Sequence, residues 1–296
     1  MAFTGQTEYG KVVAAKLRSQ LVLEGLFAHP FDGDAAGIAV KVPLTFDEEA
    51  GEYSTTNLTS NAPSYDNNDY ITININHDLY INKYIDGLNV ATASFDEKRD
   101  ALDRGAYSVA VKSNKVGMAV LINGAQGKDE AGSAFASGDA RYQQTGSVQS
   151  VGSGDVYDAL VKLAGKLTDA GVPMEDRYII VNGDGEAAIL ASNKAIRQGN
   201  LSQELVQKGF VAQIAGFNVK VTNLVTGNVG TGNDAKKIYG VVGHPLYGAN
   251  PTAFRVEPKL VDGDGDANVV GGGFVKGRVA TAYAVLDPRA FGLLTA

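Results

Sequence analysis

The longest helix that the sequence predicts lies in SFDEKRDALDRGAYSVAVKSNKVGMAVLING, residues 94–124. Its first four residues, Ser94 to Glu97, form a capping-box pattern, in which side chains satisfy the free backbone donors at a helix start. Asn123-Gly124 is a typical stop signal. About 29 residues at 1.5 Å each span roughly 43 Å, whereas a helix usually has about 11 residues, so we expect this one to act as a strut. Its apolar side is predicted to contain Phe95, Leu102, Ala106, Val109, Ala110 and Val120.

The segment before this helix is acidic and strand-like. Between Val42 and Asn82 the chain has 41 residues with seven acids and no Lys or Arg. Apolar residues alternate from Ile38 to Leu44 and from Ile71 to Ile75, which predicts a long hairpin. An isolated two-stranded arm is only marginally stable in water, so we expect it to lie on another surface, of this molecule or of a neighbouring copy. The acids are Asp47, Glu48, Glu49 and Glu52 near the tip, and Asp66, Asp69 and Asp78.

Cations along the long helix offer a surface of opposite charge. They alternate with Asp96, Asp100 and Asp103, so one interpretation is an ordinary solvated helix face. The other is that they receive the acidic hairpin of a neighbouring copy, because complementary charge selects partner and register. The cations are Lys98, Arg99, Arg104, Lys112 and Lys115.

The rest of the chain mixes helices and strands. Residues 11–27 carry apolar side chains at helical spacing before His29-Pro30, and Asp155 to Ala170 predict another helix. Residues 123–154 are rich in small and polar residues and predict a linker. Because helices and strands do not alternate regularly, we expect an α+β fold and no barrel or doubly wound parallel sheet. Further predicted elements are a strand at 178–181, a short helix at 185–192, and strands near 217–222, 238–243, 253–257 and 274–286.

Composition excludes several classes of protein. The chain has 296 residues, 44% of them hydrophobic, which is enough for one large core or two modest ones. Its net charge of -7 provides no global basic field for nucleic acid or anionic membranes. The absence of Cys rules out disulfides and thiolate chemistry. No stretch approaches the roughly 20 apolar residues of a membrane helix, so no membrane partner is expected.

Two motifs suggest chemistry, and each has a weakness. Gly183 and Gly185 follow a predicted strand in a G-x-G-x-x-A run, as in dinucleotide sites, but Asp184 and Glu186 place negative charge where a pyrophosphate would lie. The run from Asp262 to Asn268 spaces Asp262, Asp264 and Asp266 like a calcium loop but lacks the Gly and the final Glu of that motif. The three histidines are isolated in sequence, and we expect no cofactor and no catalysis.

Three stretches carry a resemblance to a known family. AGVPMEDRYIIVN at 170–182 resembles a helix-end and strand segment of the axial domain of Hong Kong 97-like coat proteins, the major capsid proteins of tailed bacteriophages. GFVAQIAGFNVKVTNL at 209–224 is similar to their G-x-I-x-x-I-x-G-F-x-V run, with Val211 and Ile214 in the first apolar positions. VATAYAVLDPRAFGLL at 279–294 is also similar. The order of arm, acidic hairpin, long helix, linker and α/β segment resembles the same fold over the whole chain.

The resemblance implies a structural protein whose hexamers and pentamers form an icosahedral shell around packaged double-stranded DNA, which is contacted non-specifically. The shell would be assembled in the host cytoplasm and be part of the virion. A compartment of the encapsulin type, with the same fold, is an alternative, as is a nucleotide-binding enzyme using Gly183 and Gly185. The implied parts are an N-terminal arm at 1–36, an extended loop at 37–80, a peripheral domain with its spine helix at 81–150 and 240–296, and an axial domain at 151–239.

The extended loop differs from that of some family members in having no Lys, which bears on how the shell is stabilised and on which partners it needs. Some members of the family cross-link their shells through a Lys in the extended loop, but this chain has none between Lys41 and Lys83. We therefore expect the shell to be stabilised noncovalently or by another protein. The chain enters the arm close to Met1, which suggests a separate scaffolding protein; a portal and decoration proteins are further expected partners. The expected intersubunit contacts join Asp47, Glu48, Glu49 and Glu52 to Lys98, Arg99 and Arg104.

Overall fold

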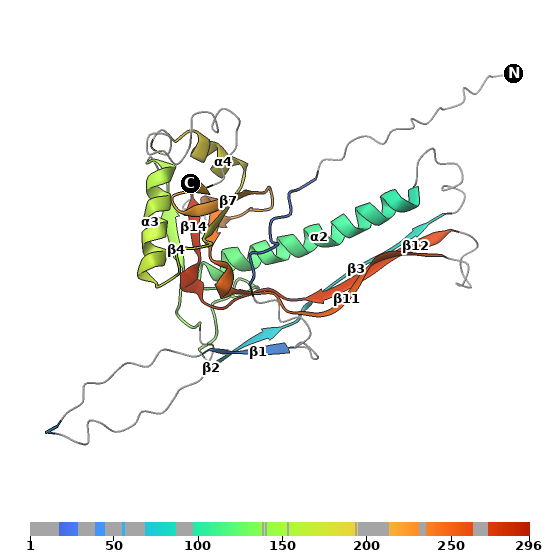
Figure 1. Ribbon diagram of the computed structural model, residues 1–296, viewed down its shortest axis with the longest axis horizontal. Coiled ribbons are helices and arrows are strands. Elements are labelled where there is room, and N and C mark those ends of the chain that lie inside the picture. Colours follow the sequence, from blue (N-terminus) through green and yellow to red (C-terminus); the bar gives the residue numbers. More distant parts are fainter. Residues whose placement is uncertain are drawn as a thin grey trace.

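The computed structural model places a long helix beside an antiparallel sheet and a compact α/β unit at one end of that helix (Figure 1). The helix is α2 (Glu97–Gly124), and the strut predicted from the sequence is confirmed. Ser94 to Asp96 of the predicted capping box lie outside the described residues. The structure describes residues 18–28, 39–44, 55–56, 69–86, 97–137, 139, 141–152, 154–192, 194, 213–230, 235–262 and 272–296.

A three-stranded antiparallel sheet runs along α2, in the order β11 (Thr252–Asp262), β12 (Gly273–Thr281) and β3 (His77–Ile85) (Figure 1). The β12 and β3 strands pair over their whole length, whereas β11 carries a register shift between Val256 and Lys259. The strands predicted near 253–257 and 274–286 are therefore confirmed, although the second ends at Thr281 and is followed by the short β13 (Ala284–Val285).

The side of α2 that faces this sheet agrees only in part with the prediction, because Leu102 packs against the buried cluster there as predicted but other positions differ. Ala101 and Gly105 are buried there, next to Ile85 and Val275, while Ala106 is exposed. The reason is the short distance between helix and sheet, because a Cβ on Gly105 would lie 2.5 Å from Cδ1 of Ile81. Small residues allow this approach, and the predicted apolar side did not include Ala101 or Gly105.

The compact unit is built on a mixed sheet. Parallel pairs join β4 to β14 and β5 to β7, and the other pairs are antiparallel, which confirms the α+β class. β4 lies inside the predicted linker, where its four residues gave no strand signal. The order is β4 (Ser147–Ser150), β14 (Gly292–Thr295), β9 (Lys236–Gly243), β5 (Tyr178–Val181), β7 (Phe217–Val221) and β6 (Gln213–Ile214), with β8 (Asn228–Val229) beside β9.

Two helices belong to this unit, α3 (Val156–Asp169) and α4 (Gly183–Leu190). Asp155 caps α3 by accepting a 2.9 Å hydrogen bond from the N–H of Tyr157, and a stripe of leucines on α3 is buried against the sheet. The buried guanidinium of Arg177 donates to the carbonyls of Ala164, Val172 and Pro173 at 2.6 to 3.0 Å, which holds the end of α3 and the following turn. Both helices and the strand at 178–181 match the prediction.

The mixed sheet draws strands from well-separated parts of the sequence. It combines residues 147–150, 236–243 and 292–295 with strands from the proposed axial segment at 151–239. The division of the chain into an arm, a loop, a peripheral domain and an axial domain therefore stays a prediction. Short elements join the parts: η3 (Pro245–Tyr247), β10 (Gly248–Ala249), which pairs with β13, and η5 (Pro288–Ala290).

The predicted N-terminal helix is wrong over its described part. Residues 18–28 contain no helix. Their apolar side chains are instead used in contacts with distant parts of the chain, because Leu23 and Leu26 are buried in the core formed with Met118 and Leu121 of α2. Tertiary burial has therefore outweighed the local helical spacing.

We predict that Gly105→Val destabilises the fold by about 1–3 kcal/mol, because added methyl groups would be forced against Ile81 and Val275. The matched control is Gly165→Val, since Gly165 also lies within a helix but has open space around it. Gly165→Val should change the free energy of unfolding by no more than about 0.5 kcal/mol. Denaturant unfolding of both variants measures the difference, and equal effects would contradict the close packing of α2 on the sheet.

Candidate intersubunit surfaces

The base of the acidic hairpin is anchored on its own chain. β1 (Ala39–Leu44) pairs antiparallel with β2 (Asp69–Asn74), with Val42 opposite Ile71, which confirms both predicted strands. The inward side chains form a buried cluster with residues that follow β9 and β12, so the base does not need a neighbouring copy for burial. Asp47, Glu48, Glu49 and Glu52 lie outside the described residues. The cluster contains Val40, Val42, Ile71, Ile73, Ala249, Ala282, Ala284 and Leu286.

A single carboxylate ties the hairpin base to the end of α2. Glu130 Oε2 accepts a 2.9 Å hydrogen bond from Asn76 Nδ2, and Glu130 Oε1 contacts Nε2 of His77. The backbone carbonyl of Glu130 accepts a 3.0 Å bond from Nδ2 of Asn123, in the last turn of α2. The direction of the hairpin base is thus coupled to the helix through one residue.

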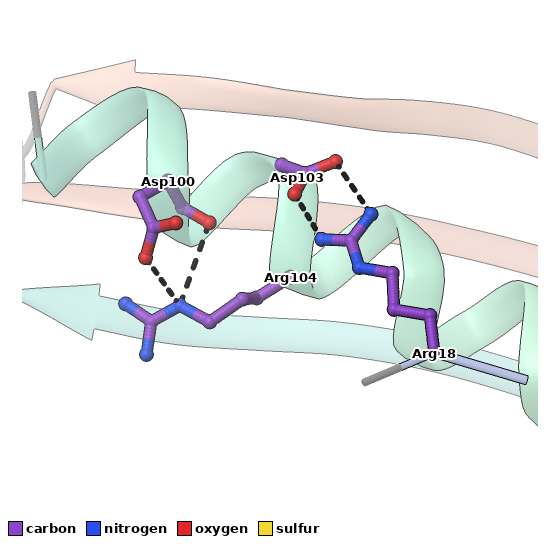
Figure 2. A network of polar contacts seen from close by, with 4 residues as sticks. All are labelled: Arg18, Asp100, Asp103 and Arg104. Carbon is purple, nitrogen blue, oxygen red and sulfur yellow. Dashed lines mark hydrogen bonds and ion pairs between the residues drawn. The ribbon is translucent and has the colours of Figure 1, made fainter. Parts of the chain in front are cut away.

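Three of the cations predicted to receive a neighbour's hairpin, Lys98, Arg99 and Arg104, have interactions within the chain. Arg104 Nε lies 2.8 Å from Oδ2 of Asp100, one turn earlier, and both guanidinium ends of Arg18 meet the carboxylate of Asp103 (Figure 2). The bond to Asp103 raises the pKa of the Arg18 guanidinium above its usual value. Lys98 and Arg99 also take part in polar or electrostatic interactions. The helix surface is therefore a mixed network of both charges and not a bare positive stripe.

A second surface that combines aromatic and charged side chains, which was not predicted from the sequence, lies on the outer face of the three-stranded sheet. Tyr80 is 74% exposed and pairs with Arg278 across β3 and β12, while Lys276 lies over the ring of Phe274 at 4.7 Å. Asp78 accepts a 2.8 Å hydrogen bond from Nε of Arg278. Every second residue of β12 contributes to this face. The alternation of Phe274, Lys276 and Arg278 in the sequence could therefore have indicated an exposed aromatic and charged strand face.

A buried ion pair stabilises the segment between α2 and β4. The guanidinium of Arg141 donates to Oδ1 of Asp139 at 2.8 Å and to the carbonyl of Val285 at 2.9 Å, and it lies over the ring of Phe135. Burial raises the pKa of the Asp139 carboxyl, but hydrogen bonds from the side chain and backbone of Arg141 outweigh this effect and hold the pKa below its usual range.

The glycine motif after β5 serves helix packing. Asn182 caps α4, because its Oδ1 accepts a 2.9 Å hydrogen bond from the N–H of Gly185, and Asp184 pairs with Lys237. A Cβ on Gly185 would lie 2.5 Å from the carbonyl oxygen of Tyr239, so glycine is needed where α4 crosses β9. One donor of the helix start is therefore already used, and the first turn is acidic, which argues against a phosphate at this position.

Other candidate sites have equally local explanations. His244 caps η3 with Nδ1, which accepts a hydrogen bond from the N–H of Leu246, and its Nε2 lies 2.8 Å from the carbonyl of Glu175.

The calcium-like run is described only at its first residue. Asp262 ends β11, whereas Asp264 and Asp266 lie outside the described residues. Within the described ranges, no three His, Asp or Glu side chains gather as a metal site. None of the helices described there is long and apolar enough to cross a bilayer.

The fold is shared with solved capsid structures over nearly the whole chain. The capsid structure of the cyanophage P-SCSP1u matches with a TM-score of 0.75 and 15% identity, covering 99% of this chain and 93% of that chain. The chain has the fold of phage capsid proteins. A chain from Mycobacterium phage Che8 matches with a TM-score of 0.73 and 14% identity, over 99% and 98% of the two chains.

A third match shows that this capsid fold is not limited to structures named for a phage. The capsid of an empty GTA particle matches with a TM-score of 0.68 and 17% identity, covering 99% of this chain and 95% of that chain. No family model and no curated protein matches the sequence. At such low identity the similarity to capsid proteins lies in the order and arrangement of the elements, which is the feature on which the predicted resemblance over the whole chain was based.

We predict that Asp139→Asn destabilises the protein at pH 7 by about 1–3 kcal/mol, because it leaves the guanidinium of Arg141 buried without its counter-ion. The pKa of Asp139 is lower in the folded chain than in the unfolded one, so its stabilisation is present above about pH 4 and is lost as pH falls through the folded value. The stability difference between the two proteins should therefore shrink as pH falls below about 4.

The control is Asp287→Asn, because Asp287 holds Arg289 in the same spacing but the guanidinium of Arg289 is exposed. Chemical unfolding at several pH values measures both variants. A difference between wild type and Asp139→Asn that is constant with pH would contradict the assignment.

Proposed function

We propose that this chain is a major capsid protein whose copies self-assemble through hexamers and pentamers into an icosahedral shell around packaged double-stranded DNA. The observation that carries the proposal is the match to capsid chains over 99% of this chain and over more than 90% of theirs. A match of that extent includes the long helix, the three-stranded sheet and the hairpin base, and not only a common subdomain.

The chemistry of the surface supports a structural role. The net charge of -7 disfavours tight, general binding of phosphate, so DNA inside the shell is contacted non-specifically and weakly. No reaction is catalysed in this proposal, and no cofactor is needed. The shell is assembled in the host cytoplasm and becomes part of the virion. Partners besides other copies are a separate scaffolding protein, a portal and decoration proteins.

The acidic hairpin is proposed as the contact between neighbouring subunits. Its acids Asp47, Glu48 and Glu49, with Glu52, meet Lys98, Arg99 and Arg104 of an adjacent copy. Because Arg104 already has Asp100 as partner, docking adds a second carboxylate to an existing pair and does not neutralise a lone cation. Exposed pairs of this kind are individually weak, but a closed shell repeats each one in every subunit.

The first experiment is electron microscopy of the purified protein with its scaffolding partner present and absent. We expect uniform closed particles that contain DNA when isolated from infected or producing cells. Particles of the same shape without nucleic acid would indicate a cargo compartment of the encapsulin type. Monomers that persist at high concentration under both conditions would overturn the proposed assembly.

Reversal of charge tests the hairpin contact. Glu48→Lys with Glu49→Lys, or Lys98→Glu with Arg99→Glu, should each reduce the yield of assembled particles by about tenfold, because like charges then face each other. Combining the four changes should restore most of the yield, as measured by sedimentation. The control is Lys162→Glu with Lys166→Glu on the exposed face of α3. A combined variant no better than either reversal would refute this pairing.

A further inference from the structure

Residues 18–28 lie in a groove between α2 and the mixed sheet, beside the helix in Figure 1. They have no helix or strand of their own and one internal turn bond, from the N–H of Leu26 to the carbonyl of Leu23, so the other backbone polar groups need partners elsewhere. Side chains from two separate parts of the fold provide these partners. We call this segment the strap.

The helix α2 binds the strap through its main chain. Oδ1 of Asn114 accepts hydrogen bonds from the N–H groups of Val22 and Leu23, at 3.1 and 3.3 Å. Nδ2 of Asn114 donates to the carbonyl of Ala110 at 3.0 Å, which fixes the amide so that its oxygen faces the strap. Tyr107 lies two turns before Asn114 on α2, and its hydroxyl accepts a hydrogen bond from the N–H of Ser19.

The mixed sheet binds the other side of the same main chain. The hydroxyl of Thr222 donates to the carbonyl of Gln20 at 2.7 Å, and Nζ of Lys220 donates to the carbonyl of Glu24 at 3.1 Å. Burial lowers the pKa of the Lys220 ammonium below its usual value, which agrees with its position over the strap and not in open solvent. The strap thus connects α2 to β7 and the residue after it.

Two leucines provide the apolar part of this binding. Leu23 and Leu26 are 7% and 1% exposed. Leu23 occupies a notch over Gly117, where a Cβ would overlap its side chain. Phe27 packs on the ring of Tyr283 at 5.1 Å between centroids, and Ala28 donates to the carbonyl of Pro245 at 3.0 Å. The groove therefore holds a backbone that turns between Leu23 and Leu26, where the N–H of Leu26 donates to the carbonyl of Leu23 at 3.1 Å and Gly25 has a φ of 75°.

We propose that the groove is a peptide-binding site for the strap, and that this noncovalent binding fixes the position of α2 relative to the mixed sheet. Within the described residues, the bonds from α2 and β7 meet on the same short segment, from Ser19 to Glu24. Its ligand is a short peptide with a turn between Leu23 and Leu26, recognised mainly through main-chain atoms. Met118 and Leu121 of α2 also pack directly in the core of the compact unit. Detachment of the strap therefore loosens the helix and its three-stranded sheet against that unit and does not free them completely.

The first test asks whether the strap stays bound without a covalent link. A protease site is inserted between Asp34 and Ala35 of the full chain, and a dye is attached at Ala2→Cys, which is unique because the chain has no other Cys. After cleavage of the folded protein, the labelled fragment should remain bound through gel filtration. A fragment that separates from the wild-type chain during the run overturns the proposal.

Variants of Asn114 test the mode of recognition. Asn114→Leu removes the acceptor for two backbone donors, so the cleaved fragment should dissociate about tenfold faster. Asn114→Asp keeps an acceptor and should retain the fragment. Thr222→Val removes the contact from the opposite side and should also speed release. Equal retention in Asn114→Leu and Asn114→Asp, with no faster release in Thr222→Val, would refute recognition through the backbone.

The second test measures the position of α2. Spin labels at Ser108→Cys on α2 and Lys162→Cys on α3, both exposed positions, report the distance between the two parts in the unassembled protein. We expect one narrow distance distribution in the otherwise wild-type chain and a clearly broader one when Asn114→Leu and Thr222→Val are combined. An unchanged distribution would show that the strap does not set this position. Neither test requires a shell to form.

Discussion

The close approach of other segments to α2 is the constraint on which the rest of the structure depends. Three glycines along the helix each admit a side chain from a different part of the chain: Ile81 of β3 at Gly105, Leu23 of the strap at Gly117 and Val285 of β13 at Gly124. Glycine lowers helix propensity, so these positions cost local stability that is recovered through tertiary packing. The helix is thus a common support for the sheet, the strap and the hairpin region.

Electrostatics has a different role in this molecule from packing. The pair between Arg141 and Asp139 is largely buried and hydrogen-bonded on several sides, so it fixes the position of the segment between α2 and β4. The pairs between Arg104 and Asp100 and between Arg18 and Asp103 are more exposed, and pairs of this kind can be exchanged for others at small cost (Figure 2). Charges on α2 are therefore better suited to choosing a partner than to holding the protomer together.

The sequence predicted the elements whose signals are local. Asp155 and the leucine spacing of α3, and the apolar run at 178–181, were sufficient for a helix and a buried strand. The strap was missed because Leu23 and Leu26 are buried by residues about 90 positions away, and spacing within the segment carries no information about them. Gly105 was missed for a similar reason, since its role depends on Ile81. The sequence identified Arg104 as a surface cation, but it did not show that Arg104 pairs with Asp100 or that Arg18 pairs with Asp103.

The position of the hairpin base follows from contacts within one protomer. Val42 and Ile71 are buried against the chain itself, and Glu130 connects Asn76 and His77 to the end of α2. If the arm docks on a neighbouring copy as proposed, its starting direction is set before the neighbour arrives, so less ordering entropy is lost. In that proposal, weak, exposed charge pairs are sufficient to select the docking surface, because the packing at the base has already limited the directions in which the arm leaves the protomer.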